Sequence, residues 1–171
     1  GSFNTALLRA AAGLVPEGAD AERRVRQRAL FVRNLRFACA EAQPQDVTVL
    51  IEPLNPRDAP GYLLHTQAEA HAIREEVGAP NLKVQFDLYH AQIGEGNLIQ
   101  LIERALPFIG EIQVADVPGR CEPGTGEINY AGVARALAAM GWRGTVGMEA
   151  FASSDSELAL ILKFAIAYGA I

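Results

Sequence analysis

Short segments rich in apolar residues recur along this chain and are separated by longer amphipathic stretches. The short segments cover residues 47–51, 82–86, 112–115 and 145–148. Segment 47–51 is a continuous run rich in β-branched side chains, which is typical of a strand covered on both faces. The pattern therefore predicts four strands.

Helices are expected between and after these strands. Asp20 is suited to the N-cap of a helix over 20–43, which Pro44 ends. Thr66 and Glu69 have the spacing of a capping box, so a second helix is expected up to about residues 78–80. Further helices are predicted over 97–106, 130–140 and 156–168. Strand followed by helix, four times over, favours parallel strands joined by right-handed crossovers.

One oxygen-bearing side chain lies at or near the carboxyl end of each predicted strand: Glu52, Asp87, Gln113 and Glu149. In an open sheet four such positions spread along a line, in steps of roughly 5 Å. In a barrel the strand ends converge on one centre. The pattern favours a barrel, in which the four residues form one site.

Three carboxylates and an amide form an all-oxygen ligand set that suits Mg²⁺ or Mn²⁺. Without a cation, the clustered carboxylates would raise one another's pKa values. A divalent ion could also polarise a hydroxy-carbonyl substrate and stabilise an enediolate, while two glutamates move the proton. The alternative for each residue taken singly is a helix cap or a solvated loop position.

Composition narrows the function classes. At 171 residues, 50% of them hydrophobic, the chain is long enough for one sizeable core, so we expect one domain or part of one. The formal charge of -5 is the wrong sign for a nucleic-acid binder. No apolar run reaches the roughly 20 residues that span a bilayer, so no membrane partner is expected. Cys39 and Cys121 lack CxxC spacing and no secretory signal is seen, so we expect a cytoplasmic protein. Gly1 and Ser2 read as the remnant of an expression tag.

Longer motifs carry a more specific signal. They are Ile51-Glu-Pro-Leu-Asn55, Phe86-Asp-Leu-Tyr-His90, Ile112-Gln-Val-Ala-Asp-Val-Pro-Gly-Arg120, Glu122-Pro-Gly-Thr-Gly-Glu-Ile-Asn-Tyr130 and the strand that ends at Glu149. In this order they resemble the hydroxypyruvate isomerase family, one of the sugar isomerases and epimerases built on a TIM barrel like that of xylose isomerase. The similarity covers about residues 13–160 and leaves 161–171 unassigned.

The resemblance implies roles for individual residues. Glu52, Asp87, Gln113 and Glu149 match the family's metal ligands, and Glu52 and Glu149 also match its proton-transferring pair. His90 is similar to a histidine that binds a substrate hydroxyl in related epimerases, the alternative being an ordinary loop histidine. Arg120 matches a substrate-facing position where a guanidinium could hold a carboxylate, the alternative being a surface salt bridge. Cys121 has no nearby activating base and is read as a plain free thiol.

The resemblance covers only the second half of the family's barrel. A TIM barrel typically needs about 250 residues, and the region of the fourth strand, residues 6–13, is rich in alanine. The expected fold is therefore α/β, a partial (β/α)₈ TIM barrel with roughly the last four to five βα units in one domain over 1–171. Half a barrel has open sheet edges, so we expect a homo-oligomer that covers them.

Three functions remain open at this point. The first is an isomerase that interconverts hydroxypyruvate and 2-hydroxy-3-oxopropanoate through a metal-stabilised enediolate. The second is a ketose 3-epimerase that uses the same metal site. The third is a catalytically silent half-barrel whose role is assembly. A compact acid-binding pocket around Arg120 would favour the first, and a longer polar groove the second.

Overall fold

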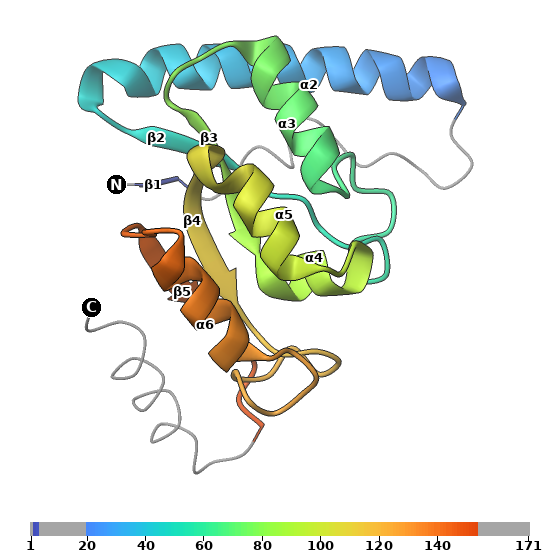
Figure 1. The fold of residues 1–171 in the computed structure, drawn as a ribbon. Helices are drawn as coiled ribbons and strands as arrows, with labels where there is room; N and C mark the ends of the chain where they lie inside the picture. Colours follow the sequence, from blue (N-terminus) through green and yellow to red (C-terminus); the bar gives the residue numbers. More distant parts are fainter. Residues whose placement is uncertain (1, 4–19, 154–171) are drawn as a thin grey trace.

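A parallel sheet whose strands follow one another in chain order forms the centre of the fold (Figure 1). The structure is a computed structural model that describes residues 2–3 and 20–153. The strands are β1 (Ser2–Phe3), β2 (Thr48–Ile51), β3 (Leu82–Asp87), β4 (Ile109–Val114) and β5 (Thr145–Met148). Each neighbouring pair is parallel. The α/β alternation predicted from the sequence is confirmed.

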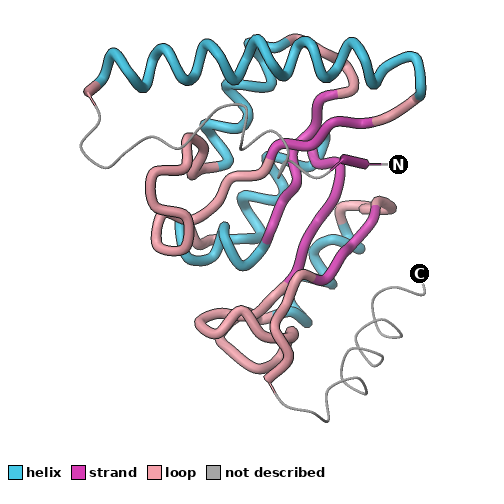
Figure 2. The backbone as a smooth tube through the Cα atoms, turned by 180° about the vertical axis from the view of Figure 1, so that it is seen from behind, coloured by secondary structure: helices cyan, strands magenta, loops and turns pink. Residues whose placement is uncertain are grey.

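Helices join the strands and cover one face of the sheet, while the view from behind shows the strands from the other face (Figure 2). They are α2 (Ala21–Ala42), α3 (Gln67–Val77), α4 (Leu88–Gly94), α5 (Leu98–Ala105) and α6 (Tyr130–Ala139), with short 3₁₀ turns at Gln43–Gln45 and Leu106–Phe108. No helix in the described ranges combines the length and the apolar character needed to cross a membrane.

The helix starts follow the predicted capping chemistry. The Asp20 side chain accepts the backbone N–H of Arg23 at the start of α2. Thr66 and Glu69 form a complete capping box at the start of α3. Gly78 ends α3 in the left-handed conformation, with a φ of 72°. These local signals fix where the helices lie and hence where the strands between them can begin.

Two apolar clusters hold the sheet against its helices. The first packs α2 and α3 on β2 and β3 through side chains such as Phe31, Leu35 and Ile73. The second packs α4, α5 and α6 on β3 and β4 through Phe86, Ile102, Ile112, Val133 and neighbouring residues. Burial of large apolar side chains on this scale is the main stabilising contribution to such a domain.

Some expected boundaries were wrong. The fourth predicted segment coincides with β5, but β4 begins at Ile109 and ends at Val114 instead of covering 112–115. Helix α4 was not predicted at all, and it follows β3 directly because Asp87 caps it. A strand at Ser2–Phe3 was not expected either, because Ser2 was read as a tag remnant. The predicted segments 6–13 and 156–168 lie outside the described residues.

Candidate active site

The four oxygen-bearing residues predicted from the sequence all lie at the carboxyl edge of the sheet. Glu52 follows β2, and Glu149 follows β5. Asp87, the last residue of β3, is the register partner of Gln113, the next-to-last residue of β4. Parallel pairing therefore brings side chains from four separate segments to one edge.

Glu52 and Asp87 are the buried acids of this edge. Their exposed fractions are 6% and 1%. Glu52 Oε1 and Asp87 Oδ2 accept no hydrogen bond from any residue that the structure describes. A buried carboxylate oxygen without a hydrogen bond is costly, so these two oxygens mark a place for a ligand.

Burial and mutual repulsion change the acid strength of this pair. Burial, followed by the negative charges of Asp87 and Glu149, raises the pKa of Glu52 to about 8. Burial raises the pKa of Asp87 to about 6, although the Tyr89 N–H and the Arg120 charge oppose the shift. Carboxyl groups with raised pKa values are suited to proton transfer. They are also suited to binding a cation, which would take the place of the protons.

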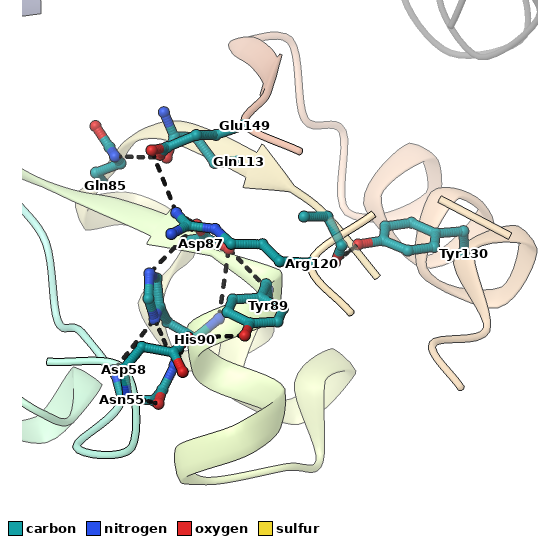
Figure 3. A network of polar contacts seen from close by, with 11 residues as sticks. Asn55, Asp58, Gln85, Asp87, Tyr89, His90, Gln113, Arg120, Tyr130 and Glu149 are labelled. Atoms are coloured by element: carbon teal, nitrogen blue, oxygen red, sulfur yellow. Dashed lines mark hydrogen bonds and ion pairs between the residues drawn. The ribbon is translucent and has the colours of Figure 1, made fainter. Parts of the chain in front are cut away.

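Asp87 serves both the fold and the site. Its Oδ1 accepts the backbone N–H groups of Tyr89 at 2.7 Å and His90 at 3.4 Å, which caps helix α4. The other oxygen, Oδ2, is thereby turned toward the site, as Figure 3 shows. Oδ1 therefore acts as the helix cap that the alternative interpretation expected, while Oδ2 is left for the candidate site.

His90 lies beside the two buried acids. One ligand atom each from Glu52, Asp87 and His90 lie within 4.8 Å of one another. The ring position is set by Asn55, whose backbone N–H donates to His90 Nδ1 at 3.2 Å. His90 is 4% exposed, so it is not the ordinary solvated loop histidine that the sequence left open.

Arg120 bridges two of the acids, as Figure 3 shows. Its Nη2 lies 3.2 Å from Glu149 Oε1 and 3.8 Å from Asp87 Oδ2. Its guanidinium carbon lies 5.3 Å from the centroid of the Tyr89 ring. Arg120 therefore lies among the candidate site residues, where it pairs with both a buried and a half-exposed carboxylate. Glu149 lies at the rim, with half of its side-chain surface exposed.

Gln85 is a site residue that the sequence analysis missed. Its Nε2 donates to Gln113 Oε1 at 2.7 Å (Figure 3), and a hydrogen bond from Gln85 also lowers the pKa of Glu52. The signal was its position two residues before Asp87, because alternate residues of a strand share a face. Gln85 therefore links the β2 and β4 sides of the site.

A second polar network holds His90 in place through Asn55. Asn55 Nδ2 donates to Asp58 Oδ2 at 3.1 Å, and the Tyr89 hydroxyl donates to the same oxygen at 2.7 Å. Burial opposes the change, but these hydrogen bonds hold the pKa of Asp58 below its ordinary value. The network fixes the loop after β2 against the start of α4, as Figure 3 shows.

The loop that carries Arg120 is shaped around one buried carboxylate. Asp116 Oδ1 accepts the N–H groups of Val117 at 2.9 Å and Ile128 at 3.0 Å, and Oδ2 accepts that of Gly124 at 2.8 Å. These three backbone N–H groups come from both ends and the middle of the loop, so their hydrogen bonds to one carboxylate fix the shape of the loop. The glycine-rich stretch is thus a loop shaped around Asp116.

Comparison with known proteins finds relatives that match most of the chain. Residues 3–166 match the model of a family described as xylose isomerase-like TIM barrel. The chain is 50% identical over 138 residues to a 2-oxo-tetronate isomerase of Cupriavidus necator, a match covering 81% of the chain and 52% of that protein. It is 38% identical over 148 residues to the hydroxypyruvate isomerase of Escherichia coli, covering 86% of the chain and 56% of that protein.

A solved structure shows the same fold. The crystal structure titled AP endonuclease, family 2, from Brucella melitensis superposes with a TM-score of 0.81 at 41% sequence identity. The superposition covers 89% of this chain and 57% of that one. The chain spans about half the length of the curated relatives it matches.

Proposed function

The chain belongs to the xylose isomerase-like TIM barrel family, and from this membership we propose that the complete protein is an isomerase of short 2-oxo acids. The reaction would interconvert hydroxypyruvate and 2-hydroxy-3-oxopropanoate by moving a proton between neighbouring carbons. The relatives named hydroxypyruvate isomerase and 2-oxo-tetronate isomerase support this substrate class. The observation that carries the proposal is the buried pair Glu52 and Asp87 beside Arg120.

The donor set fits a divalent cation, because Glu52 Oε1 and Asp87 Oδ2 are buried oxygens that accept no hydrogen bond from the described residues. Glu52, Asp87, Gln113 and Glu149 are the residues that would hold Mg²⁺ or Mn²⁺. The ion would supply positive charge that polarises the substrate carbonyl.

Glu52 and Glu149 are assigned to proton transfer. Glu52 is buried beside Asp87, and Glu149 is half exposed beside the Arg120 guanidinium. Carboxyl groups in such different surroundings can act as acid and base in one turnover. One glutamate would remove the proton from carbon, and the other would return a proton to the neighbouring carbon of the enediolate. The hydroxyl proton passes from one substrate oxygen to the other in the same conversion.

Arg120 and His90 are assigned to substrate binding. A guanidinium offers two parallel donors, which match the carboxylate of a 2-oxo acid. Because Asn55 donates to His90 Nδ1, the neutral ring carries its proton on Nε2, where it can donate to a substrate hydroxyl. A charged group for a carboxylate favours hydroxypyruvate over an uncharged ketose, the substrate of the alternative 3-epimerase.

The test is turnover of hydroxypyruvate and of 2-oxo-tetronate by the chain with Mn²⁺ or Mg²⁺, with an uncharged ketose as the comparison substrate. Glu52→Gln and Glu149→Gln should each lower turnover at least about a hundredfold, the lower range for acid–base catalysis. Glu127→Gln, in an exposed loop position, is the matched control and should be neutral.

Three outcomes contradict parts of this proposal. Near-normal turnover in the Glu52→Gln, Glu149→Gln double variant would remove the two-glutamate mechanism. Faster conversion of the ketose than of either acid would favour the epimerase. Cation binding without any turnover would leave the silent half-barrel as the description of these 171 residues.

A further inference from the structure

The loop that carries Arg120 and the segment that carries Glu149 are tied together beyond the end of β5. The backbone N–H of Phe151 donates to the Arg120 carbonyl at 2.7 Å. Cys121 and Phe151 pair as a parallel bridge, and the Asp116 N–H donates to the Cys121 carbonyl at 2.7 Å. The two segments thus extend the β4 and β5 pairing past the strands themselves.

Glu122 and Ser153 form a further contact between the same two segments. The Ser153 hydroxyl donates to Glu122 Oε1 at 2.6 Å, and the Ser153 N–H donates to Oε2 at 3.1 Å. Glu122 is only 3% exposed. A charged acceptor removed from water forms strong hydrogen bonds and is costly to leave without them, so this two-point contact is difficult to open.

Arg120 needs such support because of its backbone. Its φ is 54°, in the left-handed region that non-glycine residues seldom adopt. A conformation of this kind persists only where the surrounding contacts hold it. The contacts at Phe151 and Ser153 lie on the same two segments as the contact between Arg120 and Glu149.

We propose that Glu122 and Ser153 form a clasp that positions Arg120 against Glu149. Glu122 is a positioning residue and not a catalytic one, because both of its carboxylate oxygens accept from Ser153. The clasp makes the anion-binding and proton-transferring groups one unit, so that they approach a substrate in a fixed relation. The inference rests on the proposed function only for the roles of Arg120 and Glu149.

Cys121 provides a built-in reporter of the clasp. Cys121 lies between Arg120 and Glu122 in the sequence and is partly exposed, whereas Cys39 is buried. The experiment measures the rate at which each thiol of the intact chain reacts with an aromatic disulfide reagent. Ser153→Ala should speed labelling of Cys121 about tenfold, the change expected when a hydrogen bond to a charged group is lost. Cys39 should keep its slow rate, which shows that the fold is intact.

Two further variants make the result specific. Ser153→Thr keeps the hydroxyl and should restore slow labelling of Cys121. Thr125→Ala removes a hydroxyl that donates to the Glu122 carbonyl, not to its carboxylate, and should leave Cys121 unchanged. If Ser153→Ala does not fold, which fast labelling of Cys39 would reveal, Glu122→Gln replaces it with the same expectation.

A second readout tests positioning and needs no turnover. The side-chain N–H resonance of Arg120 should move in Ser153→Ala toward its position in Glu149→Gln, and stay in place in Thr125→Ala. The clasp is overturned if Cys121 keeps the parent rate in Ser153→Ala, or if the Arg120 resonance does not move. Neither measurement depends on isomerase activity, so failure of the proposed function would be seen separately in the turnover assay.

Discussion

The backbone N–H of Asn55 donates to His90 Nδ1 across 3.2 Å, and this contact sets which ring nitrogen carries the proton. The side-chain Nδ2 of Asn55 lies 2.7 Å from the same ring nitrogen. Because Nδ1 accepts, the neutral ring carries hydrogen on Nε2, which lies 3.9 Å from Asp87 Oδ2. A ring in this tautomer donates toward the site and offers no lone pair there to a cation.

His90 is therefore expected to contribute little to cation binding, although it lies within the acidic cluster. His90→Gln should keep most of the rise in Tm that Mn²⁺ gives, while lowering turnover of the 2-oxo acid. Nitrogen NMR should find the Nε2–H tautomer at neutral pH. Loss of the Mn²⁺ effect in His90→Gln would instead place the ring among the ligands.

Cation binding by the carboxyl edge predicts ligand-dependent stability. Mn²⁺ or Mg²⁺ should raise Tm, because an ion that binds only the folded state stabilises it, by about 2.7 kcal/mol at a hundred times its Kd. The double variant Asp87→Asn, Gln113→Leu should abolish the rise. Asparagine at 87 keeps an oxygen for the cap of α4, so the fold is retained.

The control for this measurement is Glu127→Gln, which alters an exposed carboxylate of the neighbouring loop. It should show the full rise in Tm. An unchanged rise in the double variant would move the cation site away from Asp87 and Gln113.

The raised pKa of Glu52 predicts how the cation-free chain responds to pH. Between pH 4.5, the ordinary value, and about 8, the folded chain holds a proton that the unfolded chain has released. The unfolded state binds fewer protons in this window, so the free energy of unfolding falls as pH rises. Asp87, with a pKa of about 6, adds to the lower part of the window.

Glu52→Gln removes the larger of these two contributions. In urea unfolding with a chelator present, the free energy of unfolding of the variant should fall less between these pH values. At about pH 8 the variant should be more stable than the parent. Glu127→Gln should follow the parent. Equal slopes for Glu52→Gln and the parent would show that burial does not hold this proton.

The sequence predicted which residues lie at the carboxyl edge of the sheet better than it predicted their contacts. Glu52, Asp87 and Glu149 each directly follow a short apolar segment, and Gln113 lies within one. They come together because strand ends of a parallel sheet meet at one edge. Helix α4 was missed because its seven residues are too short to show a period. It forms because Asp87 caps it and its first residues are buried.

The pairings of Gln85 with Gln113 and of Asn55 with His90 were beyond the sequence for a different reason. Each joins segments about 30 residues apart, and a side chain's partner in another segment depends on register and loop shape. The link between Glu122 and Ser153 is of the same kind. The spacing of residues along the sequence does not predict such contacts.

Self-association stays a prediction, which the sheet edge makes testable. Within the described ranges, β5 pairs only with β4, and Phe151 beyond it is 66% exposed. An unpaired strand edge with an apolar neighbour favours pairing with a second copy. Sedimentation of the 171-residue chain should give at least a dimer at micromolar concentration, whereas a stable monomer would contradict this expectation.

The shape of the Arg120 loop predicts a sharp difference between two glycines. A Cβ added at Gly126 would overlap the carbonyl oxygen of Val117 and approach Asp116 Oδ1 to 2.7 Å. These atoms belong to the backbone and to the carboxylate that organises the loop, so neither can move without breaking its hydrogen bonds. Gly94, at the end of α4, would bring its Cβ to an ordinary 3.8 Å from the His65 carbonyl.

Gly126→Ala should therefore lower the free energy of unfolding by about 1–3 kcal/mol, the range for forced overpacking, and lower affinity for the 2-oxo acid by displacing Arg120. Gly94→Ala should change stability by less than about 1 kcal/mol, since alanine favours the helix, and leave affinity unchanged. Urea unfolding and KM measured on both variants decide the matter. If Gly126→Ala keeps the parent's stability and KM, the loop is not held by Asp116 as described, and Arg120 must be positioned by other contacts.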